Sequence, residues 1–452
     1  MSKGVCHQGQ RGVWRIADDA RAAAAAGLLL AISLPAAWAQ GVPAGMPQAQ
    51  AAPQGLPEGE PALSLPRAVA LAQEGHPELA AARRELEALE GPLLQGRARP
   101  NPELAYSLED TRTATRTQTW QLNWPVELGG KRAARIEAAE RALGQARADL
   151  DAQTATVRAN VVAAYFETLA AQERAALARD SLALARAATE AVAKRVLAGK
   201  VSPVEETKAR VAEAGVRVEL AQATSEQRSA WLRLSALLGR AGAAPMPPLE
   251  GQAYALPALT GPDQLRERIL ASPALQRARI EVDRRQALTA LERARQVPDI
   301  TLSAGVKRSN ELQRNQVLLG VSVPLPVFDR NQGNLLEALK REDKARDELQ
   351  AANVRLQSEA MLAHERLGAI REEATTLQRD VLPGAKSAYD AATVGFEHGK
   401  FSFLEVLDAQ RTYFAAKSQY LKALAEAHRA AADIDRLLGV PATAPAWPAN
   451  PN

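Results

Sequence analysis

The sequence contains little cysteine and few aromatic residues, and each shortage excludes a class of protein. Its 452 residues include one cysteine, Cys6, so the rest of the chain has no disulfide and no thiolate metal site. Aromatic residues make up 4% of the chain, the formal net charge is +4, and no block of lysine or arginine stands out. Nucleic-acid binding needs a concentrated basic surface, so the composition does not support it.

A catalytic constellation is also lacking. After the first 39 residues, histidine occurs only at the scattered positions His76, His364, His398 and His428. None of them stands in a pattern that pairs a nucleophile with a base. We therefore expect no enzyme, no catalytic residue, no cofactor and no metal site. His76 precedes Pro77 at a predicted helix start, where a structural role is expected.

The N-terminus has the pattern of a secretory signal peptide over residues 1–39. Arg11, Arg15 and Arg21 precede the apolar core "AAAAAGLLLAISL", which is followed by Pro35 and the small-residue cleavage site "AWA". A core of 13 residues is too short to span a bilayer, which takes about 20. We expect cleavage after Ala39 and export of the remaining chain.

The exported part is one design used twice. "HPELAAAR" at residue 76 matches "SPALQRAR" at 272, and Pro102 matches Pro298, both at an offset of 196. "LAGKVSPVEETKAR" at 197 matches "EHGKFSFLEVLDAQ" at 397, an offset of 200. The predicted organisation is a lead-in at 40–62, a first repeat at 63–240, a connector at 241–262, a second repeat at 263–439 and a tail at 440–452.

Four segments alternate apolar and polar residues as strands do: about 102–110, 117–127, 298–307 and 315–325. In the second of them Trp120, Leu122 and Trp124 share one face. Strands of about 9–11 residues cross a bilayer when they are tilted, and aromatic residues suit its interface. Four strands do not close a barrel, and open edges are not tolerated in lipid. Three copies would supply twelve strands.

The remaining sequence predicts long helices at about 131–198, 202–239, 333–397 and 402–438. Proline is absent from Lys131 to Leu197. Apolar residues recur every seven positions, as in Val204, Val211 and Val218, and sustained heptads indicate coiled-coil packing. The fold class expected is therefore a membrane β-barrel combined with a long α-helical coiled-coil barrel.

The turns between the long helices are specified locally and occur once in each repeat. Glycine supplies a positive φ at the end of one helix, and serine followed three residues later by glutamate forms a capping box at the start of the next. We call these turns the hairpin tips. Their marker residues are Gly199, Lys200, Ser202, Gly399, Lys400 and Ser402, with Glu205 and Glu405 completing the expected capping boxes.

Two stretches carry a resemblance to a known family. "NWPVELGGKRAARIEAAE" and "VSVPLPVFDRNQGNLLEA" resemble the strand-to-helix junctions of TolC-type outer-membrane efflux proteins. The form "PLPVFDRNQGN" is similar to the heavy-metal (cobalt–zinc–cadmium) branch that serves resistance-nodulation-division pumps. The resemblance covers about residues 63–440.

The resemblance implies a passive exit duct formed by a homotrimer, with a barrel in outer-membrane lipid and a helical tunnel in the periplasm. The hairpin tips would meet a periplasmic adaptor protein, which links them to an inner-membrane pump. The junctions would turn at Pro125, Gly129, Gly130, Pro324, Pro326 and Asp329. Asp390 and Asp408, near the second tip, are candidates for a gate.

Two alternatives remain open at this point. An exit duct of the same fold serves type I protein secretion, in which a transport ATPase replaces the proton-driven pump. A periplasmic coiled-coil scaffold would explain the helices but not the strands, and would not need detergent for extraction.

Overall fold

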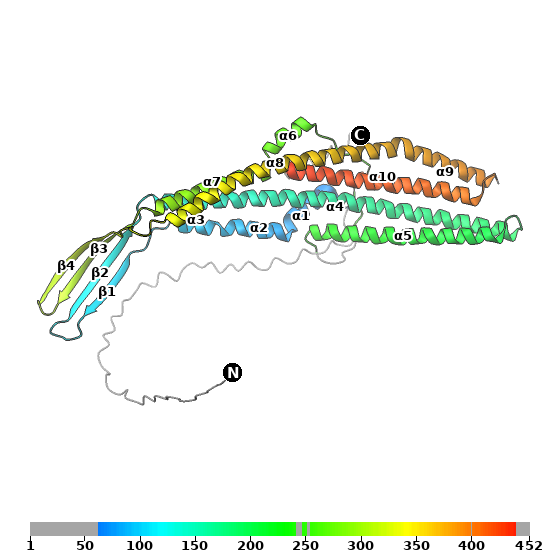
Figure 1. The fold of residues 1–452 in the computed structure, drawn as a ribbon. Helices are drawn as coiled ribbons and strands as arrows, with labels where there is room; N and C mark the ends of the chain where they lie inside the picture. Colours follow the sequence, from blue (N-terminus) through cyan, green and yellow to red (C-terminus); the bar gives the residue numbers. More distant parts are fainter. Residues whose placement is uncertain (1–61, 241–245, 251–253, 399, 440–452) are drawn as a thin grey trace, which may run out of the picture. The chain divides into compact units, whose positions relative to one another are not determined.

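The computed structural model describes residues 62–240, 246–250, 254–398 and 400–439 (Figure 1). The predicted signal peptide, all but the last residue of the lead-in, and the predicted tail lie outside the described residues. Everything described belongs to one compact unit, Pro53–Asn452.

One antiparallel sheet of four strands is formed in the order β1-β2-β3-β4. The strands are β1 (Glu103–Glu109), β2 (Thr117–Val126), β3 (Ile300–Ser309) and β4 (Arg314–Ser322). The alternation in the sequence predicted these four strands as two hairpins, and the pairing of β2 with β3 joins the hairpins. The apolar face of the sheet is exposed, since Trp120 is 53% and Leu319 is 82% accessible to solvent.

The helices form two sets that correspond to the two repeats. The first set is α1 (Leu65–Gly75), α2 (Pro77–Ala88), α3 (Glu90–Arg97), α4 (Lys131–Leu197) and α5 (Pro203–Leu237). The second set is α6 (Pro262–Leu270), α7 (Pro273–Arg295), α8 (Gln332–Thr376), the π-helical turn η1 (Leu377–Val381), α9 (Leu382–Glu397) and α10 (Phe403–Leu438). The 67 residues of α4 span about 100 Å at 1.5 Å per residue. The α4–α5 turn therefore lies far from the sheet, to which α4 is joined by its other end (Figure 1).

The first long helix of the second repeat differs from its prediction in one detail. The sequence predicts an unbroken helix over 333–397, but a π-helical turn at Leu377–Val381 separates α8 from α9. Pro383 explains the turn, because proline has no N–H to donate and its ring crowds the carbonyl group four residues earlier. A π-helical turn widens the hydrogen-bond ladder locally, so the helix continues past the proline.

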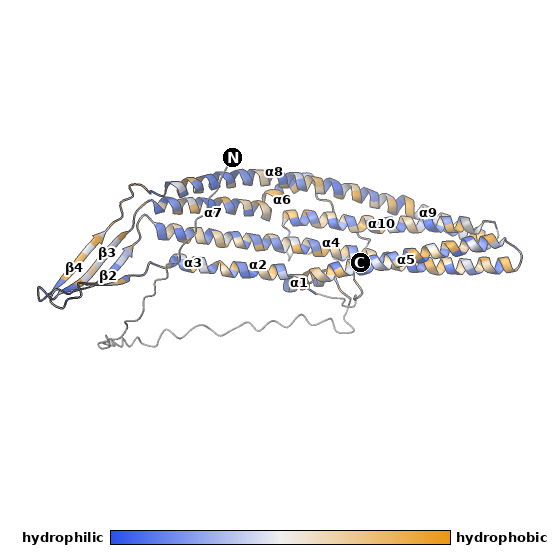
Figure 2. Ribbon diagram, turned by 60° about the horizontal axis from the view of Figure 1, so that its bottom comes forward, coloured by the Kyte–Doolittle hydropathy of each residue, from blue (hydrophilic) through white to orange (hydrophobic). Residues whose placement is uncertain are grey.

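Two apolar cores hold the helices together. One gathers residues of α1, α4 and α5, such as Val161 and Leu234, and the other gathers residues of α6, α8 and α10, such as Leu265 and Leu367. Ala432 of α10 joins the first core, so the two repeats share apolar packing. Figure 2 shows mostly hydrophilic residues on the helices near the sheet and more hydrophobic ones towards the α4–α5 turn.

The valine heptads do not pack within the chain. Val204, Val211 and Val218 on α5 are 59%, 68% and 57% exposed, whereas the small residues Ala209 and Ala212 are buried against α4. The alanines let the two helices of the hairpin approach closely. The valine stripe is left on the outer surface of the protomer.

His428 lies where the two repeats meet. Its ring, on α10, is 1% exposed and stacks on the Phe166 ring of α4 with centroids 3.5 Å apart and planes 3° from parallel. Burial lowers the pKa of His428 to about 4, because the charged imidazolium loses its hydration there. The imidazole is consequently neutral in the folded protein at neutral pH.

We predict that His428 makes the fold sensitive to acid. The unfolded chain takes up a proton near pH 6.5 and the folded chain only near pH 4, so protonation favours unfolding between these values. Stability should fall by up to about 3 kcal/mol as the pH drops through this window. Urea unfolding of the detergent-solubilised protein at several pH values measures it. His428→Phe keeps a ring against Phe166 and should remove that part of the slope; an unchanged slope contradicts the assignment.

Candidate functional site: the strand-to-helix junctions and the hairpin tips

The first junction turns on two consecutive glycines. β2 ends at Val126 and α4 begins at Lys131, with Gly129 and Gly130 between them at φ values of 68° and 72°. At Gly129 a Cβ atom would lie 2.6 Å from the Cβ of Val297, so the close approach also requires glycine. The close approach therefore requires glycine at Gly129, and Gly130 has the left-handed conformation that glycine adopts most readily.

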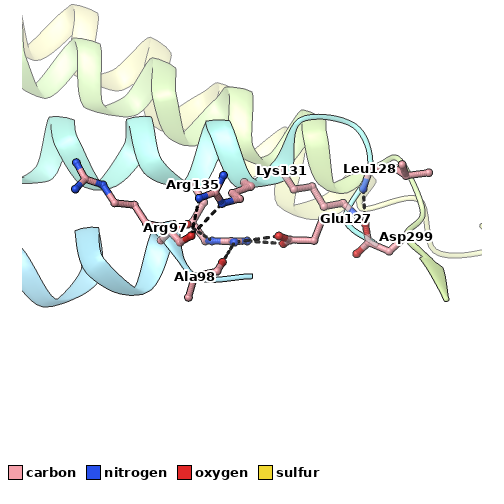
Figure 3. A network of polar contacts seen from close by, with 9 residues as sticks. Arg97, Ala98, Glu127, Leu128, Lys131, Arg135 and Asp299 are labelled. Atoms are coloured by element: carbon pink, nitrogen blue, oxygen red, sulfur yellow. Dashed lines mark hydrogen bonds and ion pairs between the residues drawn. The ribbon is translucent and has the colours of Figure 1, made fainter. Parts of the chain in front are cut away.

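A carboxylate from the other repeat holds this junction. Asp299, just before β3, accepts hydrogen bonds through Oδ1 from the backbone N–H of Leu128 (3.0 Å) and from Lys131 Nζ (2.7 Å) (Figure 3). The Lys131 side chain is 13% exposed, so this ion pair is better shielded than an ordinary surface pair. We call this arrangement the Asp299 clamp. It fixes the start of α4 to the start of β3.

Arg135, one turn along α4, extends the network. Its guanidinium donates to both carboxylate oxygens of Glu127, at 2.6 and 3.1 Å, and to the carbonyl oxygens of Gly96 and Ala98 (Figure 3). The hydrogen bond to Glu127 raises the pKa of Arg135 above its ordinary value. The bidentate pair joins the end of β2, the start of α4 and the end of α3.

The sequence interpretation missed Asp299, Lys131, Glu127 and Arg135. The repeat itself contained a signal, because Asp299 follows Pro298 as Glu103 follows Pro102. An acidic residue at the start of each hairpin indicated a shared role.

The second junction is built differently. β4 ends at Ser322, before Pro324 and Pro326, and α8 begins at Gln332. Asp329 accepts through Oδ1 from the N–H of Asn331 (2.9 Å), and Asn331, at φ 58°, is the residue before α8. The Asn331 side chain donates to the backbone oxygen and carboxylate of Glu292, which ties the turn to α7.

The first hairpin tip has the expected glycine stop. Gly199 has φ 68°, and the Lys200 N–H donates to the Arg195 carbonyl oxygen at 2.9 Å, closing the end of α4. Ser202 accepts from the N–H of Val204 at 3.3 Å. The capping box expected here is wrong, because the Glu205 carboxylate pairs with Lys208 at 3.0 Å.

The second tip has the complete capping box. Ser402 accepts from the Glu405 N–H, and the Glu405 carboxylate accepts from the Ser402 N–H at 2.6 Å, which lowers the pKa of Glu405. Lys400 donates its N–H to the Gly395 carbonyl oxygen at 2.8 Å, while Gly399 lies outside the described residues. The two tips touch, since the Arg195 guanidinium lies 4.1 Å from the centre of the Phe396 ring.

The candidate gate residues are both exposed. Asp390 on α9 pairs with Lys386 at 2.8 Å, one helical turn away. Asp408 lies on α10, where its backbone carbonyl oxygen accepts from the Thr412 hydroxyl at 2.9 Å. His398 contacts the Val394 carbonyl oxygen through Nδ1 at 2.8 Å, and His76 caps α2 by accepting from the Glu78 N–H.

Among the described residues, no helix is both long and apolar enough to cross a bilayer. The same residues contain no cluster of three or more His, Cys, Asp or Glu side chains arranged to hold a metal ion.

A small sheet with two open edges, attached to a helix about 100 Å long, is the architecture of a channel subunit rather than of a globular domain. The family model described as outer membrane efflux protein matches residues 68–240 and 265–440. The chain therefore belongs to the outer membrane efflux protein family. The efflux-channel class and the outer-membrane location predicted from the sequence are confirmed, and members of this class carry out transport rather than catalysis.

Individual relatives agree with the family. The chain is 48% identical over 377 residues to the cobalt-zinc-cadmium resistance protein CzcC of Cupriavidus metallidurans, covering 83% of this chain and 90% of that protein. The nickel-cobalt-cadmium resistance protein NccC of Alcaligenes xylosoxydans is 31% identical over 54% of this chain and 55% of its own length.

Solved structures share the fold at low identity. A membrane protein from Pseudomonas aeruginosa superposes with a TM-score of 0.70 at 22% identity, covering 83% of this chain and 90% of that one. The CusC channel gives a TM-score of 0.68 at 20% identity, with 83% and 91% covered.

We predict that the Asp299 clamp stabilises the junction. Asp299→Ala leaves the Leu128 N–H and the shielded Lys131 ammonium without their acceptor, which should cost about 1–3 kcal/mol. Thermal unfolding followed by circular dichroism in detergent measures the loss. The matched control is Asp263→Ala, which removes an acid that is 91% exposed and pairs only with Arg266 on its own helix. Equal effects of the two substitutions contradict a special role for Asp299.

Proposed function

We propose that this protein is the outer-membrane exit duct of a tripartite efflux system that exports heavy-metal cations. The main support for this proposal is the 48% identity to the cobalt-zinc-cadmium resistance protein CzcC across 90% of that protein's length. The second relative, named for nickel, cobalt and cadmium resistance, supports the same substrate class. The duct itself performs no bond chemistry, and energy is supplied by an inner-membrane pump of the resistance-nodulation-division type.

The working unit is a homotrimer. β1 and β4 each have one edge that pairs with nothing in the described chain, and the sheet exposes an apolar face. Lipid contains no water to satisfy open strand edges, so closure by further copies is required. Three copies supply twelve strands around one barrel. The exposed valine stripe of α5 supports association along the helices as well.

The hairpin tips dock the periplasmic adaptor. Gly199, Lys200, Ser202, Gly399, Lys400 and Ser402 mark these turns, and Arg195 and Phe396 hold the two tips together. Val204 is exposed directly after the first tip and Phe401 directly before Ser402 of the second. The tips therefore present polar turns flanked by exposed apolar side chains, a mixture suited to a protein partner.

We predict that loss of the gene lowers tolerance to cobalt, zinc and cadmium, and that the wild-type chain restores it. Gly199→Val should fail to restore tolerance, because a β-branched residue at φ 68° is strained and reshapes the tip. The measurement is growth in graded metal concentrations, with trimer content checked by mass in detergent.

Gly144→Val is the matched control for the tip variant. Like Gly199, Gly144 has no atom within 4 Å of an added Cβ, but it lies within α4 and has no positive φ. It should restore tolerance. Full restoration by Gly199→Val as well would count against the tip as the docking site, and unchanged metal tolerance on deletion would remove the proposed substrate class.

Asp390 and Asp408 form the gate in this proposal, since each appears three times around the axis of a trimer and carboxylate rings attract cations to a pore mouth. Asp390→Ala combined with Asp408→Ala should raise single-channel conductance in planar bilayers. Lys386→Ala frees Asp390 from its ion pair but keeps the carboxylate, so it should not raise conductance. Unchanged conductance of an intact double-variant trimer would show these acids to be ordinary surface charges.

A further inference from the structure

The internal repeat can be carried through the sheet residue by residue. In the first hairpin Ala105 pairs with Gln121, and in the second Thr301 pairs with Ser322. Because Pro102 matches Pro298, adding 196 to the number of a β1 residue gives the equivalent residue of β3. Ala105 is thus equivalent to Thr301, so their partners Gln121 and Ser322 are equivalent too, and the offset from β2 to β4 is 201.

Independent features agree with the second offset. An advance of 201 takes Pro125 to Pro326, and it takes the left-handed residue Gly130 to the left-handed residue Asn331. It also takes the first residue of α4, Lys131, to the first residue of α8, Gln332. The two strand-to-helix junctions are therefore equivalent position by position, although they were built from different residues.

The equivalence shows that the second junction lacks, within the described chain, the strand that pairs with the end of β2 at the first junction. β2 pairs with β1 only as far as Asn123, and its last residues Trp124–Val126 are held by β3 alone. Their equivalents, Leu325–Val327, extend beyond the last pair of β4 with β3, Ser322 with Thr301. Within the described chain they have no strand beside them, and Leu325 is 80% exposed.

We infer that β1 of a neighbouring protomer pairs with residues 322–328 in a definite register, which turns Leu325–Val327 into strand. Applying the offsets to the observed pairs of β2 with β3 gives this register. The observed pairs are Leu122 with Ala304, Trp124 with Leu302 and Val126 with Ile300. The equivalent pairs across the seam are Val323 with Leu108 of the neighbour, Leu325 with its Tyr106, and Val327 with its Leu104. This inference rests on the trimer proposed above and specifies its seam.

The side chains fit this register. Leu104, Tyr106 and Leu108 lie on one face of β1, and all are exposed in the protomer. Val323, Leu325 and Val327 are exposed too, and the register brings each opposite one of those three residues. A shift by one residue would instead oppose the two valines and Leu325 to Ala105, Ser107 and either Glu103 or Glu109. The register thus continues the apolar face of β1–β4 across the seam.

The neighbour also completes the junction. Asp299 accepts from Leu128 and Lys131 inside the chain, and its equivalent is Glu103, at the start of β1. The equivalents of Leu128 and Lys131 are Asp329 and Gln332. In the closed seam Glu103 of one protomer therefore faces the Asp329 N–H and the Gln332 side chain of the next. The second junction is incomplete without this residue.

Cysteine cross-linking in the full-length protein tests the register. The background is Cys6→Ser, which leaves no cysteine in the chain. Tyr106→Cys with Leu325→Cys places two thiols in directly opposed positions, about 5 Å apart at Cα, within reach of a disulfide. Within one chain these positions lie on opposite edges of a four-stranded sheet, about 14 Å apart across three strand spacings, so only neighbouring protomers can be joined.

The matched control keeps Tyr106→Cys and moves the second cysteine to Val321, on the same exposed face but four residues out of register, about 13 Å away. Oxidised membranes should convert the monomer band of the in-register variant to covalent trimer on a non-reducing gel. The control and each single-cysteine variant should remain monomeric on that gel.

Mass measurement in detergent separates the two levels of inference. A trimer that cross-links through Val321→Cys, or through neither pair, overturns the register and leaves the proposed trimer standing. A monomer in detergent overturns both.

Discussion

The pairing of β2 with β3 is the interaction on which the rest of this structure depends. Ten residue pairs from Thr117–Ser309 to Val126–Ile300 join two hairpins that are 174 or more residues apart in the sequence. Without it the chain would have two isolated hairpins, which are marginal alone in water. The pairing also places Asp299 beside the start of α4, so the direction of the longest helix is set from the sheet. The clamp and the sheet are consequently one unit.

The helical part follows a different rule. In the α4–α5 hairpin, small residues such as Ala209 and Ala212 make buried contacts, so the two helices approach closely and the valines of α5 remain on the outside. A globular domain would bury Val204, Val211 and Val218. In the proposed trimer, neighbouring helices would cover the valine stripe of α5, whereas the apolar face of the sheet would lie against lipid.

Much of this could be predicted from the sequence, because the patterns involved are local or repeated. Period-two alternation indicated the four strands, the proline-free run from Lys131 indicated α4, and glycine before serine indicated the tips. What could not be predicted depends on partners distant in the sequence. The Asp299 clamp needs the pairing of β2 with β3. Glu205 and Glu405 stand at equivalent places, but the Glu205 carboxylate pairs with Lys208 whereas the Glu405 carboxylate accepts from the Ser402 N–H. The π-helical turn before Pro383 could not be predicted either, because the sequence shows only a proline within a helical pattern and not how the helix accommodates it.

The two junctions differ in charge although their positions are equivalent. Inside the chain, Lys131 and Asp299 form a shielded ion pair. In the proposed seam between chains the corresponding positions hold Gln332 and Glu103, so no matching cation stands at the start of α8. Gln332 is exposed in the protomer and forms its hydrogen bonds locally, accepting from the Arg330 N–H and donating to the Phe328 carbonyl oxygen. In the proposed seam a neutral side chain, Gln332, thus stands where the charged Lys131 stands in the junction inside the chain.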